Sequence, residues 1–174
     1  MCGLAGYFLT QSNYCSSINE QNKNITSALK FLGHRGPDDQ GVFQDKDSPI
    51  TLLHTRLSII DTTRAGRQPM YSSDKHLTLV FNGEIYNYKS LKDQLNNNNI
   101  KNWESNSDTE VLITLFDNKD MSINSIKNKL KDLKGIFSFA LWNSNTRELI
   151  IARDAMGVKP FYYMATKYGF VFSS

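Results

Sequence analysis

Hydrophobic positions along the chain follow two spacings, one typical of strands and one typical of helices. Short apolar or alternating runs bounded by polar residues predict strands, because alternate side chains of a strand face the same side of a sheet. Asn82-Gly83 is expected to end one of these strands in a turn, since this dipeptide commonly forms turns. The predicted strands cover residues 3–9, 50–55, 77–81, 136–142, 149–152, 161–164 and 170–173.

Apolar residues three and four positions apart predict four helices. The first ends before Gly33, and the segment 34–38 that follows is predicted to be a structured loop because Pro37 cannot continue a helix. The third begins near Asp108, where Ser107 and Glu110 have the spacing of a capping box. The asparagines at 96–99 are expected to form a surface loop. The helical positions are Ile18, Ile25, Ala28, Leu29 and Leu32; Tyr88, Leu91 and Leu95; Val111, Leu112, Leu115 and Phe116; and Ile126, Leu130 and Leu133.

The predicted strands and helices occur in groups and do not alternate strictly. This order favours two antiparallel sheets covered by helices over a doubly wound parallel sheet, so we expect an α+β fold. The chain contains no GxGxxG after a strand and no phosphate-binding P-loop, so nothing indicates nucleotide binding.

The composition is that of one ordinary globular domain. The 174 residues are 40% hydrophobic and 21% charged, which excludes fibrous and disordered classes. The 20 Lys and Arg against 17 Asp and Glu leave a net charge of +3 without a basic cluster, so we expect no nucleic-acid partner. With no long apolar run and no signal-peptide pattern at the start, we expect no membrane association and a cytoplasmic location.

The Cys and His residues do not form a recognisable metal site. Two cysteines are too few for a disulfide framework, and three histidines stand at scattered positions. No CxxC or HExxH spacing is present, so we predict no required metal and regard Cys15 as a bystander.

Cys2 is a candidate nucleophile because of its place in the chain. A side chain this small at position 2 permits removal of Met1, after which Cys2 carries both a thiol and a free α-amino group. An α-amine with a pKa of about 7.7 to 8.0 can act as the base that such a nucleophile needs. Position alone favours an incidental cysteine, so other segments must support a catalytic role for Cys2.

Six segments give Cys2 its context: MCGLAGYF (1–8), HRGPDDQG (34–41), LHTRLSIID (53–61), FNGEIYNY (81–88), SDTEVL (107–112) and RDAMGVKPFYY (153–163). In this order they resemble the class II glutamine amidotransferase domain of asparagine synthetases, over essentially the whole chain. Related glutaminase domains of purine and hexosamine synthesis differ at the second and third segments. Met70 and Phe161 stand where leucine is usual, away from the proposed chemistry.

The resemblance implies an N-terminal nucleophile hydrolase fold, a four-layer αββα sandwich of two antiparallel sheets between helical layers. It also implies that Cys2 attacks the side-chain amide of L-glutamine, releases ammonia and leaves a γ-glutamyl thioester. The Asn82 side chain and the Gly83 N–H would bind the oxyanion, where each donor can contribute about 3 to 4 kcal/mol. An ordinary turn is the simpler meaning of Asn82-Gly83 alone.

The resemblance also assigns the residues that would bind the substrate. Arg56 would hold the α-carboxylate, and Glu84 with Asp108 would hold the α-ammonium. Asp108 could instead complement a helix dipole. Backbone groups of four consecutive residues would line the pocket, although their side chains alone look like core. These are Leu57, Ser58, Ile59 and Ile60.

Other polar and aromatic residues are expected to be structural. His34 would order its loop, Arg35 and Asp38 would pair, and Arg153-Asp154 would hold a turn. The aromatic residues Phe137 and Phe139 and those at 161–163 would belong to core strands, because no basic patch accompanies them.

Residues 1–174 are therefore expected to form a single glutaminase domain that needs no cofactor. The resemblance implies that ATP and Mg²⁺ serve a separate synthetase domain, which we do not find here because no Ser-Gly-Gly-x-Asp-Ser type loop is present. The expected partners are L-glutamine and a synthetase domain or acceptor subunit that receives ammonia for asparagine synthesis. Three alternatives stay open: a standalone glutaminase, amidation of another carboxylate, and a non-catalytic glutamine-binding or regulatory module.

Overall fold

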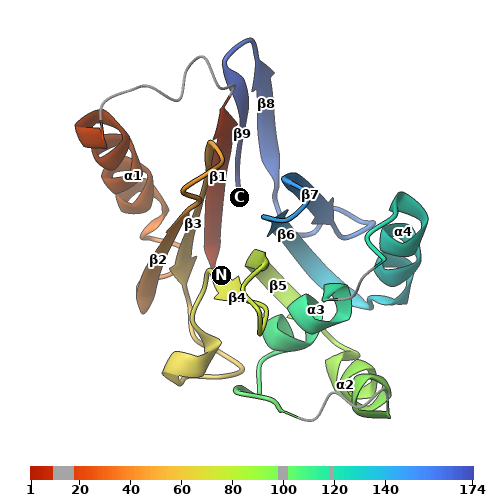
Figure 1. Cartoon of the computed structure of the whole chain (residues 1–174). Helices are drawn as coiled ribbons and strands as arrows, with labels where there is room; N and C mark the ends of the chain where they lie inside the picture. Colours follow the sequence, from red (N-terminus) through yellow and green to blue (C-terminus); the bar gives the residue numbers. More distant parts are fainter. Residues whose placement is uncertain (10–17, 98–101, 118–119) are drawn as a thin grey trace.

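Two antiparallel sheets stack face to face, with helices on their outer sides (Figure 1). The computed structural model describes residues 1–9, 18–97, 102–117 and 120–174. The first sheet has the order β2-β3-β1-β9-β8 and the second has the order β4-β5-β6-β7. The strands are β1 Gly3–Leu9, β2 Asp39–Gln44, β3 Ile50–Arg56, β4 Met70–Tyr71, β5 Leu77–Ile85, β6 Gly135–Asn143, β7 Glu148–Arg153, β8 Tyr162–Thr166 and β9 Gly169–Ser173.

The helices complete four layers. Helix α1, Ile18–Leu32, covers the first sheet, and three helices lie on the outer side of the second (Figure 1). They are α2 Tyr88–Asn97, α3 Asp108–Phe116 and α4 Ile123–Asp132. This arrangement confirms the predicted αββα architecture and all four helices. None of the helices in the described ranges is long and apolar enough to span a membrane.

Alternation along the strands divides the side chains between layers. In β5, Val80 packs with Leu4 and Trp142 between the sheets, whereas its neighbour Phe81 packs toward the helical side with Phe116. Because alternate residues of a strand share a face, Asn82 lies on the inter-sheet side, like Val80. The strand therefore directs Asn82 toward the sheet that carries Cys2.

The expected turn at Asn82-Gly83 is wrong, because β5 continues to Ile85. Asn82 is paired with Ser138 and Gly83 with Phe137 in β6. Gly83 is not among the described residues with positive φ, so backbone conformation is not the reason for a glycine here. A Cβ at Gly83 would lie 2.3 Å from the carbonyl oxygen of Ile136, so close strand contact requires the glycine.

The aromatic strand residues are core only in part. Phe137 and Phe139 are buried as predicted, whereas Tyr162 and Tyr163 are each 71% exposed, so their core assignment is wrong. They lie on β8, which is an edge strand. Two strands, β2 and β4, were not predicted. The expected loop at 96–99 is also wrong in part, because α2 extends to Asn97. Residues 98 and 99 of that loop lie outside the described residues, and so does Cys15.

Candidate active site

Cys2 directly precedes β1, and its thiol contacts Leu57, the residue that directly follows β3. The Leu57 N–H donates to Sγ of Cys2 at 3.4 Å, and Sγ lies 3.6 Å from the Leu57 carbonyl oxygen. Arg35 donates from Nε to the Cys2 carbonyl at 3.2 Å. Burial raises the pKa of the Cys2 thiol, while the Leu57 N–H and the positive N-terminus act in the opposite direction.

A pocket of about 120 Å³ opens beside Cys2. Nine of the ten residues that the sequence assigned to catalysis or substrate binding line it, although they come from distant parts of the chain. The exception is Ser58, whose N–H instead donates to the Asp38 carboxylate at 2.7 Å. The nine are Cys2, Arg56, Leu57, Ile59, Ile60, Asn82, Gly83, Glu84 and Asp108.

The free edge of β5 presents hydrogen-bond donors to this pocket. Strand β4 pairs with β5 only at Thr78 and Leu79. Beyond that point the Phe81 N–H donates to the Gln68 side chain at 2.6 Å, and the Ile85 N–H donates to Asp108 at 2.9 Å. Alternate N–H groups of a strand point the same way, so the Gly83 N–H is directed to this edge as well.

The Asn82 side chain supplies a second donor. It is 1% exposed, and its Nδ2 has no hydrogen-bond partner among the described residues. A buried amide without a partner costs free energy, typically about 1 to 3 kcal/mol. A ligand oxygen in the pocket could accept this hydrogen bond together with that of Gly83.

Arg56 ends β3 as a buried cation at the wall of the pocket. Its Nη1 donates to the Thr63 carbonyl at 2.8 Å, and its Nη2 donates to the Asp61 carbonyl. A guanidinium has five N–H donors, so these two bonds orient it and leave others for a carboxylate. Gly66 provides the space, because a Cβ there would lie 2.3 Å from Nη2.

Asp108 faces the pocket from the first turn of α3, which the Ser107 hydroxyl caps as predicted. The second half of the expected capping box is absent, because the Glu110 carboxylate accepts from the N–H groups of Glu104 and Ser105. Burial raises the pKa of Asp108 to about 6, and the nearby charge of Glu84 adds to that effect. Asp108 is thus a buried carboxylate whose charge a cation would stabilise.

The supporting residues differ in part from expectation. Arg35 and Asp38 do not pair among the described residues; each holds a different backbone group near Cys2. Ile59 is 73% exposed, so the alternative that the side chains of 57–60 are core is wrong.

Two other residues have the structural roles that were expected of them. His34 contacts the Phe31 carbonyl at 2.8 Å and does not line the pocket, in agreement with a structural role. Asp154 accepts from the N–H groups of Val158 and Lys159, which is the expected turn.

Several pocket residues were not predicted. Gln68, Thr109 and Lys159 line the pocket and are buried, and Nζ of Lys159 lies 3.2 Å from Sδ of Met1. Thr109 and Lys159 stand within the quoted segments and Gln68 lies between two of them, but no spacing in the sequence distinguishes these residues. Met1, Asp61, Gly66, Phe81 and Ser107 complete the lining.

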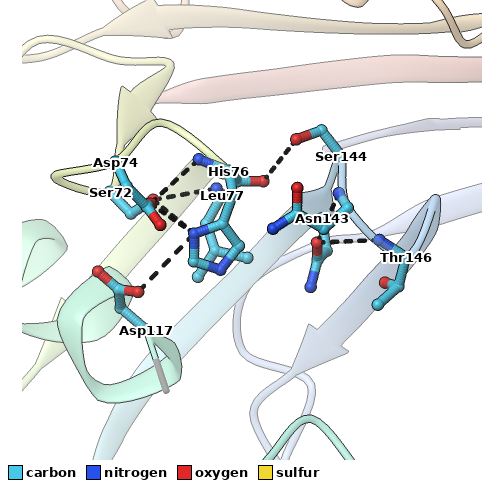
Figure 2. Close-up of polar contacts among 9 residues, drawn as sticks. Ser72, Asp74, His76, Leu77, Asp117, Asn143, Ser144 and Thr146 are labelled. Carbon is cyan, nitrogen blue, oxygen red and sulfur yellow. Dashed lines mark hydrogen bonds and ion pairs between the residues drawn. The ribbon is translucent and has the colours of Figure 1, made fainter. Parts of the chain in front are cut away.

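A cluster that the sequence did not indicate lies where the hairpin between β4 and β5 meets the C-terminal end of α3 (Figure 2). Asp74, His76 and Asp117 bring potential ligand atoms within 4.8 Å of one another. His76 Nδ1 lies 2.5 Å from Asp74 and 3.9 Å from Asp117. The shorter separation is that of a hydrogen bond, and the Ser72 hydroxyl and His76 N–H also donate to the same Asp74 oxygen. The cluster therefore acts as a hydrogen-bonded turn.

A larger hollow of about 520 Å³ lies between α1 and the strands β8 and β9. Its described lining is mostly apolar and includes Phe31, Tyr162 and Met164, with no cysteine, acid or base. The chemistry-bearing residues gather in the smaller pocket.

Known proteins resemble this chain over its whole length. The family model described as "Glutamine amidotransferase domain" matches residues 1–174. Asparagine synthetase [glutamine-hydrolyzing] 2 of Bacillus subtilis is 34% identical over an alignment of 177 positions, which covers 100% of this chain and 21% of that protein. Asparagine synthetase B of Escherichia coli is 34% identical over 169 residues, 97% of this chain and 28% of that protein. The amidase chry2 of Gibberella zeae is 34% identical over 94% of this chain and 24% of its own length.

A solved structure has the same fold. The glutamine phosphoribosylpyrophosphate amidotransferase from B. subtilis, complexed with ADP and GMP, superposes with a TM-score of 0.75 and 25% identity. The superposition covers 99% of this chain and 41% of that one. The chain thus spans about a quarter of the length of the curated relatives named above. From its full-length family match and this fold, the chain belongs to the glutamine amidotransferase domain family, on the branch that includes the glutamine-hydrolysing asparagine synthetases.

Proposed function

We propose that this chain hydrolyses L-glutamine to L-glutamate and ammonia, with Cys2 as the nucleophile. The observation that carries the proposal is the buried Asn82 Nδ2, which has no hydrogen-bond partner among the described residues and lines the same pocket as Cys2. An amide donor left unpaired beside a thiol is what an oxyanion would satisfy.

The substrate would lie between Arg56 and Asp108. The Arg56 guanidinium would bind the α-carboxylate, and the Asp108 and Glu84 carboxylates would bind the α-ammonium. The side-chain amide would then extend toward Cys2. Leu57, Ile59 and Ile60 line the pocket, and their backbone groups would contact the substrate. Ser58 does not line it, and its N–H bonds the Asp38 carboxylate instead.

The reaction needs Cys2 as the first residue. Once Met1 is removed, the α-amine takes the thiol proton while the sulfur attacks the amide carbon. The tetrahedral intermediate places its oxyanion on Asn82 Nδ2 and the Gly83 N–H, and the proton passes to the departing nitrogen as ammonia leaves. Water, deprotonated by the same amine, then hydrolyses the thioester and releases glutamate. This half-reaction uses no cofactor.

The ammonia would serve an amidation carried out by a synthetase domain or partner subunit, with ATP and Mg²⁺ needed there. Asparagine synthesis from aspartate is our first assignment, because asparagine synthetases are among the relatives. Amidases match equally well at 34% identity, so another carboxylate acceptor is the alternative. A nucleophilic free thiol favours a reducing compartment, and we therefore assign the protein to the cytoplasm.

The experiment is intact mass measurement before and after incubation with an electrophilic glutamine analogue, a diazo-oxo-norleucine. We expect loss of the Met1 mass and one adduct on Cys2 that excess glutamine prevents. The matched control is Cys2→Ala, which should acquire no adduct. An adduct elsewhere, or none on a chain that begins with Cys2, would contradict the proposal.

Retention of Met1 favours the second candidate, a glutamine-binding module without turnover. Met1 lines the pocket and its sulfur contacts Lys159. A chain that keeps Met1 has no free amine on Cys2, and we expect it to be inert toward the analogue.

A further inference from the structure

Two buried side chains hold the backbone of Phe81, the residue before the proposed oxyanion hole. Phe81 directly precedes Asn82 and lies beyond the end of the β4 pairing. Its N–H donates to Gln68 at 2.6 Å, and its carbonyl oxygen lies 3.1 Å from Nε2 of His54. A strand edge usually meets another strand or water, but here two side chains take the place of a strand.

His54 reaches Phe81 from the other sheet. It lies on β3, two residues before Arg56, and is 0% exposed. Burial lowers the pKa of His54 to about 4, so the ring is neutral near neutral pH. A carbonyl oxygen can only accept a hydrogen bond, so Nε2 carries the proton and Nδ1 is unprotonated. Nδ1 has no partner among the described residues, which leaves the bond to Phe81 as the polar contact that fixes the ring.

Gln68 connects the backbone N–H of Phe81 to the helix that carries Asp108. Its Oε1 accepts from Phe81, and its Nε2 lies 3.5 Å from the Thr109 hydroxyl. Gln68 is 9% exposed and lines the pocket. The Gln68 side chain thus links β5, the strand that carries the proposed oxyanion donors, to the first turn of α3.

We propose that His54 and Gln68 are positioning residues. They fix the backbone N–H and C=O of Phe81 and thereby aim the Asn82 side chain and the Gly83 N–H at the carbonyl oxygen of the amide that Cys2 attacks. The inference rests on the proposed function. Neither residue touches the reacting atoms. Their effect is on geometry that matters in the transition state, so their loss should lower kcat more than it weakens glutamine binding.

The test compares His54→Gln, His54→Asn and His54→Leu. Glutamine can place its amide nitrogen near the position of Nε2 and so restore the hydrogen bond to Phe81. Asparagine places its amide nitrogen near the position of Nδ1, which has no partner among the described residues, so the bond to Phe81 stays lost. We expect His54→Asn and His54→Leu to lower kcat about 10- to 100-fold, and His54→Gln to recover most of that loss. Glutamine Kd, measured in a Cys2→Ala background, should change by less than about threefold in each case. Gln68→Met should behave like His54→Leu.

Thr55→Val is the matched control. Thr55 is also fully buried on β3, and its hydroxyl donates to the Leu32 carbonyl at 3.1 Å, on the side of α1. This variant loses a buried hydrogen bond without touching Phe81, so we expect lower stability and an unchanged kcat. Equal losses of kcat in Thr55→Val and His54→Leu, or no recovery in His54→Gln, would overturn the proposal.

Hydrogen exchange provides a readout that does not need activity. Exchange of the amides at 81–85 should accelerate in His54→Leu and Gln68→Met but not in Thr55→Val. If the wild-type chain released no ammonia, the proposed function would be wrong. The exchange comparison would still decide whether His54 and Gln68 hold the backbone of Phe81. Unchanged exchange at 81–85 would show that His54 and Gln68 do not hold this segment.

Discussion

The Asp108 carboxylate accepts the Ile85 N–H at 2.9 Å, where the start of α3 meets the end of β5. This bond favours the ionised carboxylate, but burial outweighs it and raises the pKa of Asp108 to about 6 from an ordinary 3.8. Folding therefore disfavours the charge, and glutamine needs that charge for its α-ammonium. Stability and substrate binding then respond to pH in opposite directions.

For binding, we predict that KM for glutamine rises as pH falls through about 6, because protonated Asp108 no longer attracts the ammonium. Steady-state kinetics between pH 5 and 8 measure this. In Asp108→Asn, KM should be high at every pH in that range. A wild-type KM independent of pH would remove Asp108 from the ammonium site.

For stability, we predict that Asp108→Asn is more stable than wild type at pH 8, by up to about 3 kcal/mol. Above pH 6 the wild-type protein carries the unfavourable charge. As pH falls through about 6 toward 3.8 the group takes up its proton in the folded state, so the cost disappears. Urea unfolding of both proteins at pH 8 and pH 5 should give a smaller difference at pH 5, whereas a larger one would contradict the sign.

Much of this fold could be predicted from periodicity, and the failures have physical causes. Strand β2 was missed because Asp39–Gln44 is half polar and contains Gly41, while its exposed and half-buried residues alternate at the edge of the sheet. Asn82-Gly83 suggested a turn because local chemistry favours one, but pairing with β6 overrides it. The exposure of Tyr162 depends on sheet order, which aromatic content does not reveal.

The candidate site was predicted through its resemblance to a family, not through spacing. Arg56 and Asp108 are unremarkable as single residues, and the pocket that unites them depends on both sheets and α3. The positioning role proposed for Gln68 and His54 could not be predicted from the sequence, because it depends on their contacts with the backbone N–H and C=O of Phe81. Backbone partners leave no pattern in a sequence.

Gly66 should be important for substrate binding because it leaves room for the Arg56 guanidinium. A Cβ at this position would lie 2.3 Å from Nη2 of Arg56, so Gly66→Ala must displace the guanidinium. We predict that KM for glutamine rises about 10-fold or more, with a smaller effect on kcat, as for the loss of a charged hydrogen bond. Arg56→Ala should raise KM further. A Gly66→Ala enzyme with normal KM would mean that the carboxylate binds elsewhere.

Exposure of the Cys2 amine should control activity. A tag cleaved immediately before Cys2 allows the same protein to be measured with and without a free amine. We predict no ammonia release before cleavage and turnover after it, because a residue before Cys2 blocks the base and stands at the pocket wall, as Met1 does. Cys2→Ala, cleaved in the same way, is the control for contaminating glutaminase, and equal rates before and after cleavage would assign the base to another group.

Asn82 should contribute to the rate and not to stability. Its Nδ2 is buried without a partner among the described residues, so the folded protein already bears the cost of that group. We predict that Asn82→Ala lowers kcat about 10²- to 10³-fold with little change in KM, since the oxyanion exists only in the reaction. Removing an unsatisfied amide offsets the small cavity left behind, so the melting temperature should stay close to that of wild type. A large fall in melting temperature with an unchanged kcat would make Asn82 a structural residue and leave the oxyanion with the Gly83 N–H alone.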